Sequence, residues 1–180
     1  MILGHSELTK LIKSDNLITG LSERDQKDPE GCVFDLQLSK IYELKGRAFL
    51  GIDERETPEL IEVASYDPQK RSSFIFKPGN YYMVKTVEVV NMPENIAAVV
   101  KPRTTTFRSG LYLRAGFINP GYNGTLDFAI KNEGPIDVEI ELGARFAQIF
   151  FMEVKGKAVN TYRGQWQGGK SNTRGREKQI

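Results

Sequence analysis

Residues 101–154 constrain the fold most strongly, because short apolar stretches alternate there with turn residues. The stretches are Leu111–Ile118, Thr125–Lys131, Ile136–Leu142 and Phe146–Val154, separated by NPGYNG, NEGP and LG. Asn, Gly and Pro favour turns, and short strands joined by turns are typical of antiparallel sheets. The region therefore predicts consecutive antiparallel strands.

The chain before residue 101 extends this pattern. Phe34, Leu36 and Leu38 alternate with polar residues, which is the period of a half-buried strand. The pieces AFLGI, LIEVA and SFIF predict three short strands, and Tyr81–Val90 and Ile96–Val100 predict two more. The whole pattern predicts a mainly β fold, an antiparallel barrel or jelly roll.

Helix is expected in two places only. Leu8, Leu11 and Ile12 have helical spacing near the N-terminus, and one turn is expected near 104–109. The polar run 22–31, SERDQKDPEG, predicts a loop because it offers little apolar surface to bury.

Length and composition fit one globular domain at residues 1–154, followed by a tail at 155–180. The chain has 180 residues and is 39% apolar, enough for a sizeable core. The tail contains five glycines, and its seven Lys or Arg against Glu177 give it a formal charge of +6, leaving about −4 on the body. We expect a flexible tail unless a ligand or a neighbouring subunit orders it.

Several classes of site are excluded by the rarity of histidine and cysteine. His5 and Cys32 are the only residues of these types, so a zinc deaminase site and an intramolecular disulfide are excluded. A serine triad would have to use His5, which lies in the predicted N-terminal helix. The sequence has no Walker A motif and no apolar run long enough for a membrane span or a signal peptide. A cytoplasmic location is the simplest expectation.

A basic, hydroxyl-rich segment predicts an anion site. Lys101, Arg103 and Arg108 surround three threonines at 104–106. Guanidinium and hydroxyl donors match phosphate oxygens. The alternative is a solvated connection between elements, since basic clusters are common on protein surfaces.

The segment from Arg114 to Gly124, RAGFINPGYNG, predicts a hairpin that a ligand can approach closely. Glycine permits close contact with the backbone, and Tyr122 can stack on a sugar or a base. The alternative is an ordinary hairpin turn.

Together these segments resemble the dCTP deaminase and trimeric dUTPase superfamily over most of the chain. MIL with its short helix and EGCVFDLQL resemble the N-terminus of the deaminase branch. PRTTTFRSGL resembles the phosphate-binding motif, and AGFINPGYNG resembles the hairpin that recognises the nucleoside. LGARFAQIFF resembles the motif that follows that hairpin, and YRGQWQGG resembles the C-terminal lid. The resemblance implies a distorted jelly-roll barrel and a homotrimer with nucleotide sites between subunits.

The resemblance also assigns roles to residues. It implies phosphate binding by Arg103, Thr104, Thr105 and Gln148, with Arg108 as a phosphate contact or a catalytic arginine. It implies nucleoside binding by Ala115, Gly116, Phe117, Ile118, Asn119 and Tyr122, and a lid containing Tyr162, Trp166 and Gln167. Mg²⁺ is expected on the triphosphate without direct protein ligands, and zinc is not expected.

Two positions depart from the family pattern. Ala129 stands where the deaminases have a proton-shuttling Glu, and Asn119 stands where the dUTPases have a water-activating Asp. Neither side chain is a general base. Asp127 shares a strand face with Ala129 and is a candidate base; alternatively it is a surface charge paired with Lys131.

The sequence therefore leaves three functions open. The first is a pyrimidine deoxynucleoside triphosphate hydrolase that converts dCTP to dUTP, dUTP to dUMP and diphosphate, or both. The second is a catalytically silent nucleotide sensor, suggested by Ala129 and Asn119. The third is a trimer whose basic tail contacts nucleic acid.

Overall fold

The computed structural model describes residues 1–156 and 160–179 as a mainly β structure with short helices. The helices are α1 (His5–Asp15), α2 (Glu23–Lys27) and α3 (Thr104–Arg108). The first seven strands are β1 (Ile18–Thr19), β2 (Phe34–Lys45), β3 (Phe49–Leu50), β4 (Glu54–Glu56), β5 (Glu59–Ser65), β6 (Ser73–Phe76) and β7 (Tyr81–Asn91). The others are β8 (Ile96–Pro102), β9 (Leu111–Arg114), β10 (Asn123–Asn132), β11 (Val138–Glu141), β12 (Arg145–Glu153) and β13 (Glu177–Lys178).

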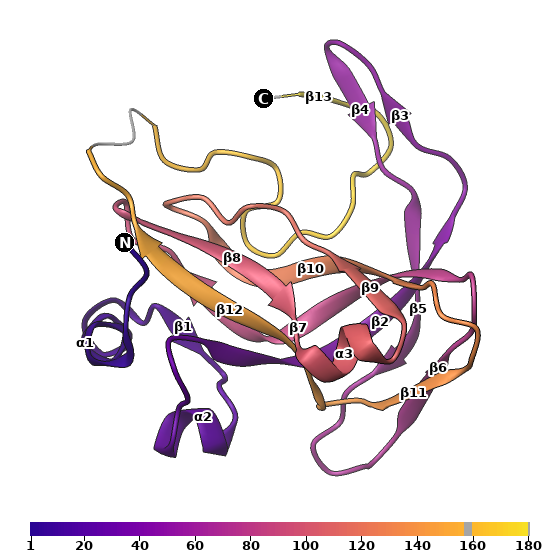
Figure 1. Cartoon of the computed structure of the whole chain (residues 1–180). Helices are drawn as coiled ribbons and strands as arrows, with labels where there is room; N and C mark the ends of the chain where they lie inside the picture. The colour runs from indigo at the N-terminus through magenta and orange to yellow at the C-terminus, as the bar shows by residue number, and fades with distance from the viewer. Residues whose placement is uncertain (157–159, 180) are drawn as a thin grey trace.

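An eight-stranded antiparallel sheet forms the body, with strand order β8-β12-β2-β7-β10-β9 (Figure 1). Strands β1 and β5 add to this path by pairing with β7 and β2. The sheet curls until Ala98 of β8 meets Ile118, just beyond β9, and the two residues exchange backbone hydrogen bonds of 3.0 Å in both directions. This bridge closes the ring, so the predicted jelly-roll type barrel is confirmed.

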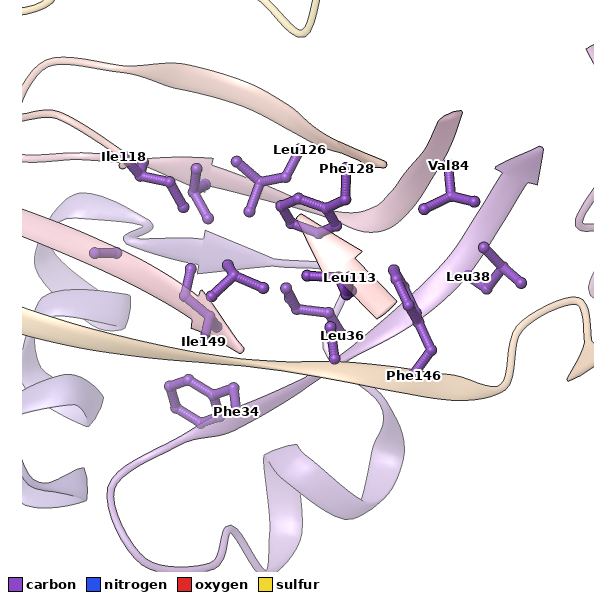
Figure 2. Close-up of a cluster of buried hydrophobic side chains, with 14 of the residues drawn as sticks. Phe34, Leu36, Leu38, Val84, Leu113, Ile118, Leu126, Phe128, Phe146 and Ile149 are labelled. Atoms are coloured by element: carbon purple, nitrogen blue, oxygen red, sulfur yellow. The ribbon is translucent and has the colours of Figure 1, made fainter. Parts of the chain in front are cut away.

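The core lies inside the ring and consists of inward-facing side chains from opposite strands. Figure 2 shows Phe34, Leu36 and Leu38 of β2 together with Phe146 and Ile149 of β12. Residues from β7, β9, β10 and the segment after β9 fill the other side: Val84, Leu113, Ile118, Leu126 and Phe128. The alternation read from the sequence therefore identifies the buried face of each long strand.

Two of the three described helices, α1 and α3, lie where the sequence predicts a helix. Helix α1 buries Leu8 completely and ends at Asn16, whose left-handed conformation (φ 52°) is a common helix terminator. The predicted loop at 22–31 is partly wrong, because it contains α2. Ser22 caps this helix by accepting a hydrogen bond from the backbone N–H of Asp25. No described helix has the length and apolar character needed to cross a membrane.

The predicted strands are found, with one clear correction. The stretch Leu111–Ile118 is a strand only as far as Arg114. Beyond Arg114 the chain leaves β10, and Ile118 pairs with β8 instead. The predicted hairpin is therefore found, since β9 and β10 pair on either side of the segment 115–122, but its connection is a broad loop that reaches β8 and not a short turn.

A small arm projects from the barrel and holds the C-terminal segment. Strands β3 and β4 form the arm, and β13 pairs with β4 through Glu177 opposite Arg55 (Figure 1). Arg176 lies within 4.0 Å of Glu54 and Glu56, so basic charge of the tail meets acidic charge of the body. Residues 157–159 and 180 of the predicted tail lie outside the described residues.

Glu88 is a fully buried carboxyl group on the inner face of β7. Both of its oxygens accept hydrogen bonds from the backbone N–H of Gln37, at 3.1 and 3.0 Å, beside the shift in register between β2 and β7. Burial raises the pKa of Glu88 to about 8, with further contributions from Asp25 and Asp35 and partial relief from the Gln37 N–H. The group is therefore mainly protonated at neutral pH.

The raised pKa makes stability depend on pH in a defined direction. Between the ordinary pKa of 4.5 and the folded value of about 8, the folded state binds more protons than the unfolded state, so stability falls as the pH rises. We expect Glu88→Gln to remove most of this loss, on the order of a few kcal/mol. Urea unfolding at pH 5 and pH 9 measures it, with the exposed Glu59→Gln as control. Equal pH dependence in Glu88→Gln and the original protein would contradict the assignment.

Candidate active site

The loop 115–122 is fixed by backbone hydrogen bonds at several points. Besides the Ile118 bridge, the N–H of Gly121 donates to Met92 O (3.0 Å) and the N–H of Met92 donates to Tyr122 O (2.8 Å). Gly121 has a φ of +82°, and a Cβ there would lie 2.6 Å from the Thr161 side chain. Glycine is therefore required at this position, and the hydrogen bonds hold the loop against the barrel.

A cavity of about 440 Å³ lies beside this loop, over the outer face of β7 and β10. Five of the six loop residues predicted to bind a nucleoside line it: Gly116, Phe117, Ile118, Asn119 and Tyr122. Ala115, the sixth, instead lines a separate depression with Lys101 and Tyr112. Leu60, Met83 and Leu126 give much of the wall apolar character, which suits a flat aromatic ligand.

Asp127 is the one acidic side chain among the described residues that line this cavity. It lies on β10 opposite Lys85 of β7, with 15% of its side chain exposed and its Oδ1 3.6 Å from Lys85 Nζ. The alternative of a surface pair with Lys131 is wrong, because Lys131 lies beside Glu133 at 3.8 Å. Burial raises the pKa of Asp127 above its usual range, and Lys85 and Ser171 offset part of that rise.

The two departures from the family pattern lie near Asp127. Ala129 is the next residue on the same face of β10, lies opposite Met83 and is largely buried. Its methyl group neither accepts nor donates a proton. Asn119 lines the cavity, but its amide does not act as a general base at neutral pH. Asp127 is therefore the side chain in this cavity best suited to accept a proton from water.

The tail lies beside the cavity, and two of the three residues predicted for the lid line it. Tyr162 and Trp166 line it, and the Tyr162 ring meets the Tyr122 ring edge to face at 5.4 Å. The Gln167 side chain donates to Gly121 O (2.9 Å) and accepts from Asn123 N (3.1 Å). Further along, Thr173 is buried and exchanges hydrogen bonds with Thr57. The lid role of these residues stays a prediction.

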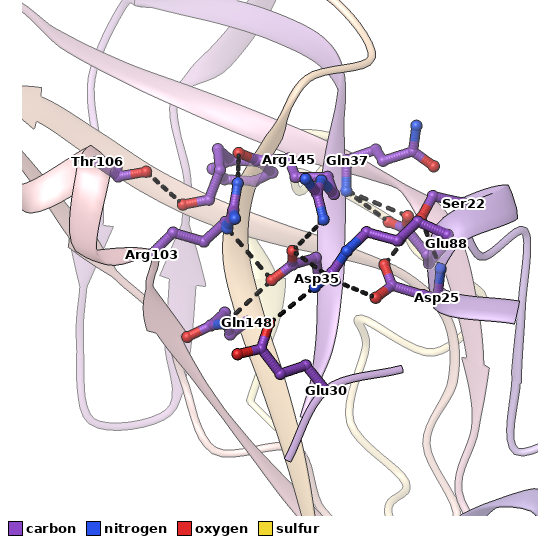
Figure 3. Close-up of polar contacts among 12 residues, drawn as sticks. Ser22, Asp25, Glu30, Asp35, Gln37, Glu88, Arg103, Thr106, Arg145 and Gln148 are labelled. Carbon is purple, nitrogen blue, oxygen red and sulfur yellow. Dashed lines mark hydrogen bonds and ion pairs between the residues drawn. The ribbon is translucent and has the colours of Figure 1, made fainter. Parts of the chain in front are cut away.

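A second cluster gathers three arginines around Asp35, a carboxylate with 4% of its side chain exposed (Figure 3). Arg145 Nη1 lies 2.8 Å, Arg103 Nε 3.3 Å and Arg24 Nη1 3.8 Å from its oxygens. Gln148 also donates to it, at 3.1 Å. The cluster brings Arg103 and Gln148 together on Asp35 and adds Arg145 and Arg24, which the sequence did not suggest. Phosphate binding by Arg103 and Gln148 stays a prediction.

The other residues predicted to bind phosphate lie on α3. Thr104, Thr105 and Arg108 are exposed. Thr106 is not available to a ligand, because its buried hydroxyl donates to Phe146 O at 2.6 Å. Arg103, at the start of α3, is linked to Asp35, so the helix and the cluster form one basic face.

Within one chain the basic face and the cavity are separate. None of the residues predicted to bind phosphate is among the described residues that line the cavity. The apolar, aromatic cavity therefore lies in one place on the chain and the basic face in another.

Comparison with known proteins places the chain in a family. A model of the dCTP deaminase-like family matches residues 2–154. A protein of Dictyoglomus thermophilum named "dCTP deaminase, dUMP-forming" is 26% identical over 167 residues, covering 90% of this chain and 85% of that protein. A "probable deoxyuridine 5'-triphosphate nucleotidohydrolase" of Archaeoglobus fulgidus is 29% identical over 170 residues, covering 93% of this chain and 96% of that protein.

A solved structure supports the fold. The crystal structure of 2'-deoxycytidine 5'-triphosphate deaminase from Agrobacterium tumefaciens is similar to 86% of this chain, with a TM-score of 0.65 and 19% identity. This chain corresponds to 49% of that longer one. With a barrel of the same type and a family match over residues 2–154, the chain belongs to the dCTP deaminase-like family.

Proposed function

We propose that the protein is a hydrolase of pyrimidine deoxynucleoside triphosphates that deaminates dCTP, cleaves dUTP to dUMP and diphosphate, or does both. The observation that carries the proposal is a cavity with aromatic walls and Asp127 in its floor. Relatives named dCTP deaminase and dUTP nucleotidohydrolase support it. They give no support to a catalytically silent sensor.

The cavity and the basic face account for the two halves of such a substrate. Tyr122 and Trp166 offer aromatic surface to the nucleoside, and backbone groups of 116–119 can read the edge of the base. Arg103, Arg108 and Gln148, with Thr104 and Thr105, would hold the triphosphate and the Mg²⁺ that it carries. Because these halves are separate in one chain, the complete site would form between subunits of a homotrimer in the cytoplasm, with residues 155–180 as its lid.

Asp127 supplies the acid–base chemistry in this proposal. In deamination it takes a proton from water as the oxygen bonds to C4 of cytosine, and it returns that proton to the amino group, which leaves as ammonia. The second proton of the water passes from the new C4 hydroxyl to N3, which leaves a carbonyl at C4. The balance is dCTP plus water giving dUTP plus ammonia. Burial supports this role, because a carboxyl group with a raised pKa transfers protons more readily near neutral pH.

Cleavage of dUTP is the second candidate reaction. Asp127 would then activate the water that attacks the α-phosphorus, and diphosphate would leave. One relative is named "dCTP deaminase, dUMP-forming", and dUMP is the nucleotide that this cleavage would release. Incubation of the purified protein with dCTP, dUTP or dTTP and Mg²⁺, followed by assays for ammonia, diphosphate and nucleotides, separates the reactions. Saturable binding without product would contradict the enzyme proposal, and salt-sensitive retention of DNA or RNA instead would favour the nucleic-acid hypothesis.

Replacement of Asp127 tests the base directly. We expect Asp127→Asn to lower kcat about 100-fold or more while nucleotide binding persists, because the amide cannot accept the proton. Steady-state kinetics and a nucleotide titration measure the two effects. Asp137→Asn removes an exposed carboxylate paired with Lys77 and serves as control. Full activity of Asp127→Asn would show that another group activates the water.

Replacement of Arg108 tests the basic face. Arg108 is exposed and forms no ion pair among the residues that the structure describes, so its loss should leave the unfolding temperature unchanged. We expect Arg108→Met to raise KM for the triphosphate about 10- to 100-fold through loss of a charged hydrogen bond. Arg71→Met, also exposed, is the control. An unchanged KM would exclude Arg108 from the phosphate site.

A further inference from the structure

Lys85 links the floor of the cavity to the tail. Its Nζ lies 3.6 Å from Asp127 Oδ1 and donates a 2.7 Å hydrogen bond to the carbonyl oxygen of Gly169. Only 15% of its side chain is exposed, so the ammonium group depends on protein acceptors. One cation is thus shared between a carboxylate of the barrel and a backbone group of the tail.

Asp127 lies near Lys85 but forms no hydrogen bond with it. A separation of 3.6 Å is too long for a hydrogen bond. Its Oδ1 is buried and has no hydrogen-bond partner among the described residues. A buried polar atom without a partner is unusual in a folded protein. Asp127 lines the cavity, so this carboxyl group combines an unsatisfied buried oxygen with a place at the candidate site.

The tail fits against β10 in one position. A Cβ at Gly169 would lie 2.4 Å from Thr125 Oγ1, and a Cβ at Gly124 would lie 2.3 Å from Gly169 N. The N–H of Gly168 also donates to Asn123 O at 2.7 Å. Backbone therefore rests directly on backbone, and this contact sets the position of the Gly169 carbonyl relative to Lys85.

We propose that Lys85 is a positioning residue that makes Asp127 an effective base only while the tail is seated on β10. The inference rests on the proposed function, in which Asp127 activates water. If Gly169 withdraws, Lys85 loses that acceptor, and the Asp127 carboxylate is its nearest remaining partner. A closer ion pair stabilises the carboxylate and weakens it as a base. The seated tail shares the cation and keeps Asp127 reactive.

The other charged groups around Asp127 do not duplicate this link. Tyr81, Tyr162 and Lys170 line the same cavity. Tyr42 of β2 and Tyr122 of the loop feel the charge of Asp127, and Glu62 of β5 acts on Tyr42. Burial raises the pKa of Tyr42 and of Tyr122 to about 12, so they stay neutral near pH 7. Lys170 pairs with Glu177 at 3.3 Å, and Glu62 pairs with Lys40 at 2.7 Å.

A double-mutant cycle read by carbon-13 NMR of the Asp127 carboxyl tests the link without substrate. Asp127→Asn identifies the signal. We expect Lys85→Met to raise the titration midpoint by about one pH unit, because an opposite charge is lost. Gly169→Ala displaces the tail and should lower the midpoint, both because water reaches Asp127 and because Lys85 moves closer to it. The part of this shift that depends on Lys85 should vanish in the Lys85→Met background, so the shift should be smaller there.

Matched variants make the result specific. Gly156→Ala imposes similar backbone strain (φ +93°) with no neighbour within 4 Å, so it should leave the midpoint unchanged. Lys85→Arg should preserve the response to Gly169→Ala, and Lys85→Gln replaces Lys85→Met if that variant does not fold. An equal shift from Gly169→Ala in both backgrounds, or no shift from Lys85→Met, would overturn the inference.

Failure of the proposed function and failure of the Lys85 inference would give different results. The titration does not require turnover, so NMR coupling without any nucleotide product would contradict the proposed function alone. Nucleotide turnover without NMR coupling would contradict the role of Lys85 alone.

Discussion

Two backbone hydrogen bonds between Ala98 and Ile118 determine where the candidate site can form. They pull the segment after β9 across to β8 and complete the ring. Because Ile118 is held at that seam, the neighbouring residues 115–122 cannot fold back as a tight hairpin onto β10. They stand away from the sheet and leave a cavity on its outer face. Closure of the fold and formation of the pocket therefore have the same cause.

The tail then changes the character of that outer face. Thr125, Asp127 and Ala129 alternate with the core residues of β10, so an uncovered sheet would expose them to water. Trp166 and the backbone of Gly168 and Gly169 cover this surface instead. A carboxylate and an ammonium group on an outward face become a largely buried pair. The raised pKa of Asp127 follows from this covering.

Much of the fold was predictable because the long strands keep a period of two. The inner faces of β2, β7, β10 and β12 follow directly from that alternation. Helix α2 was missed because it depends on the Ser22 cap and has no apolar stripe. The end of β9 at Arg114 was missed because the residues up to Ile118 have strand composition. Their pairing is decided by a distant strand, which local pattern does not reveal.

Site residues were predictable where they belong to a recognisable sequence motif. Residues whose role depends on packing between distant segments were missed. Asp35 occupies a polar position in an alternating strand, which indicates exposure, yet the ends of α3 and β12 enclose it with Arg103 and Arg145. Lys85 also occupies a polar position in an alternating strand, β7, which indicates exposure. The tail covers it, although the tail is about 80 residues away in sequence. Both roles depend on contacts between distant segments.

The placement of the acid and the placement of the tail are physically connected. Two residues of strand rise, about 7 Å, separate Asp127 from Ala129 along β10. Asp127 is the nearer of the two to Gly124, the residue against which Gly169 packs. An acid at position 129 would lie opposite Met83, whereas the acid at 127 lies opposite Lys85 and shares it with the tail. Moving the carboxylate along the strand therefore places its chemistry under the control of the segment that covers it.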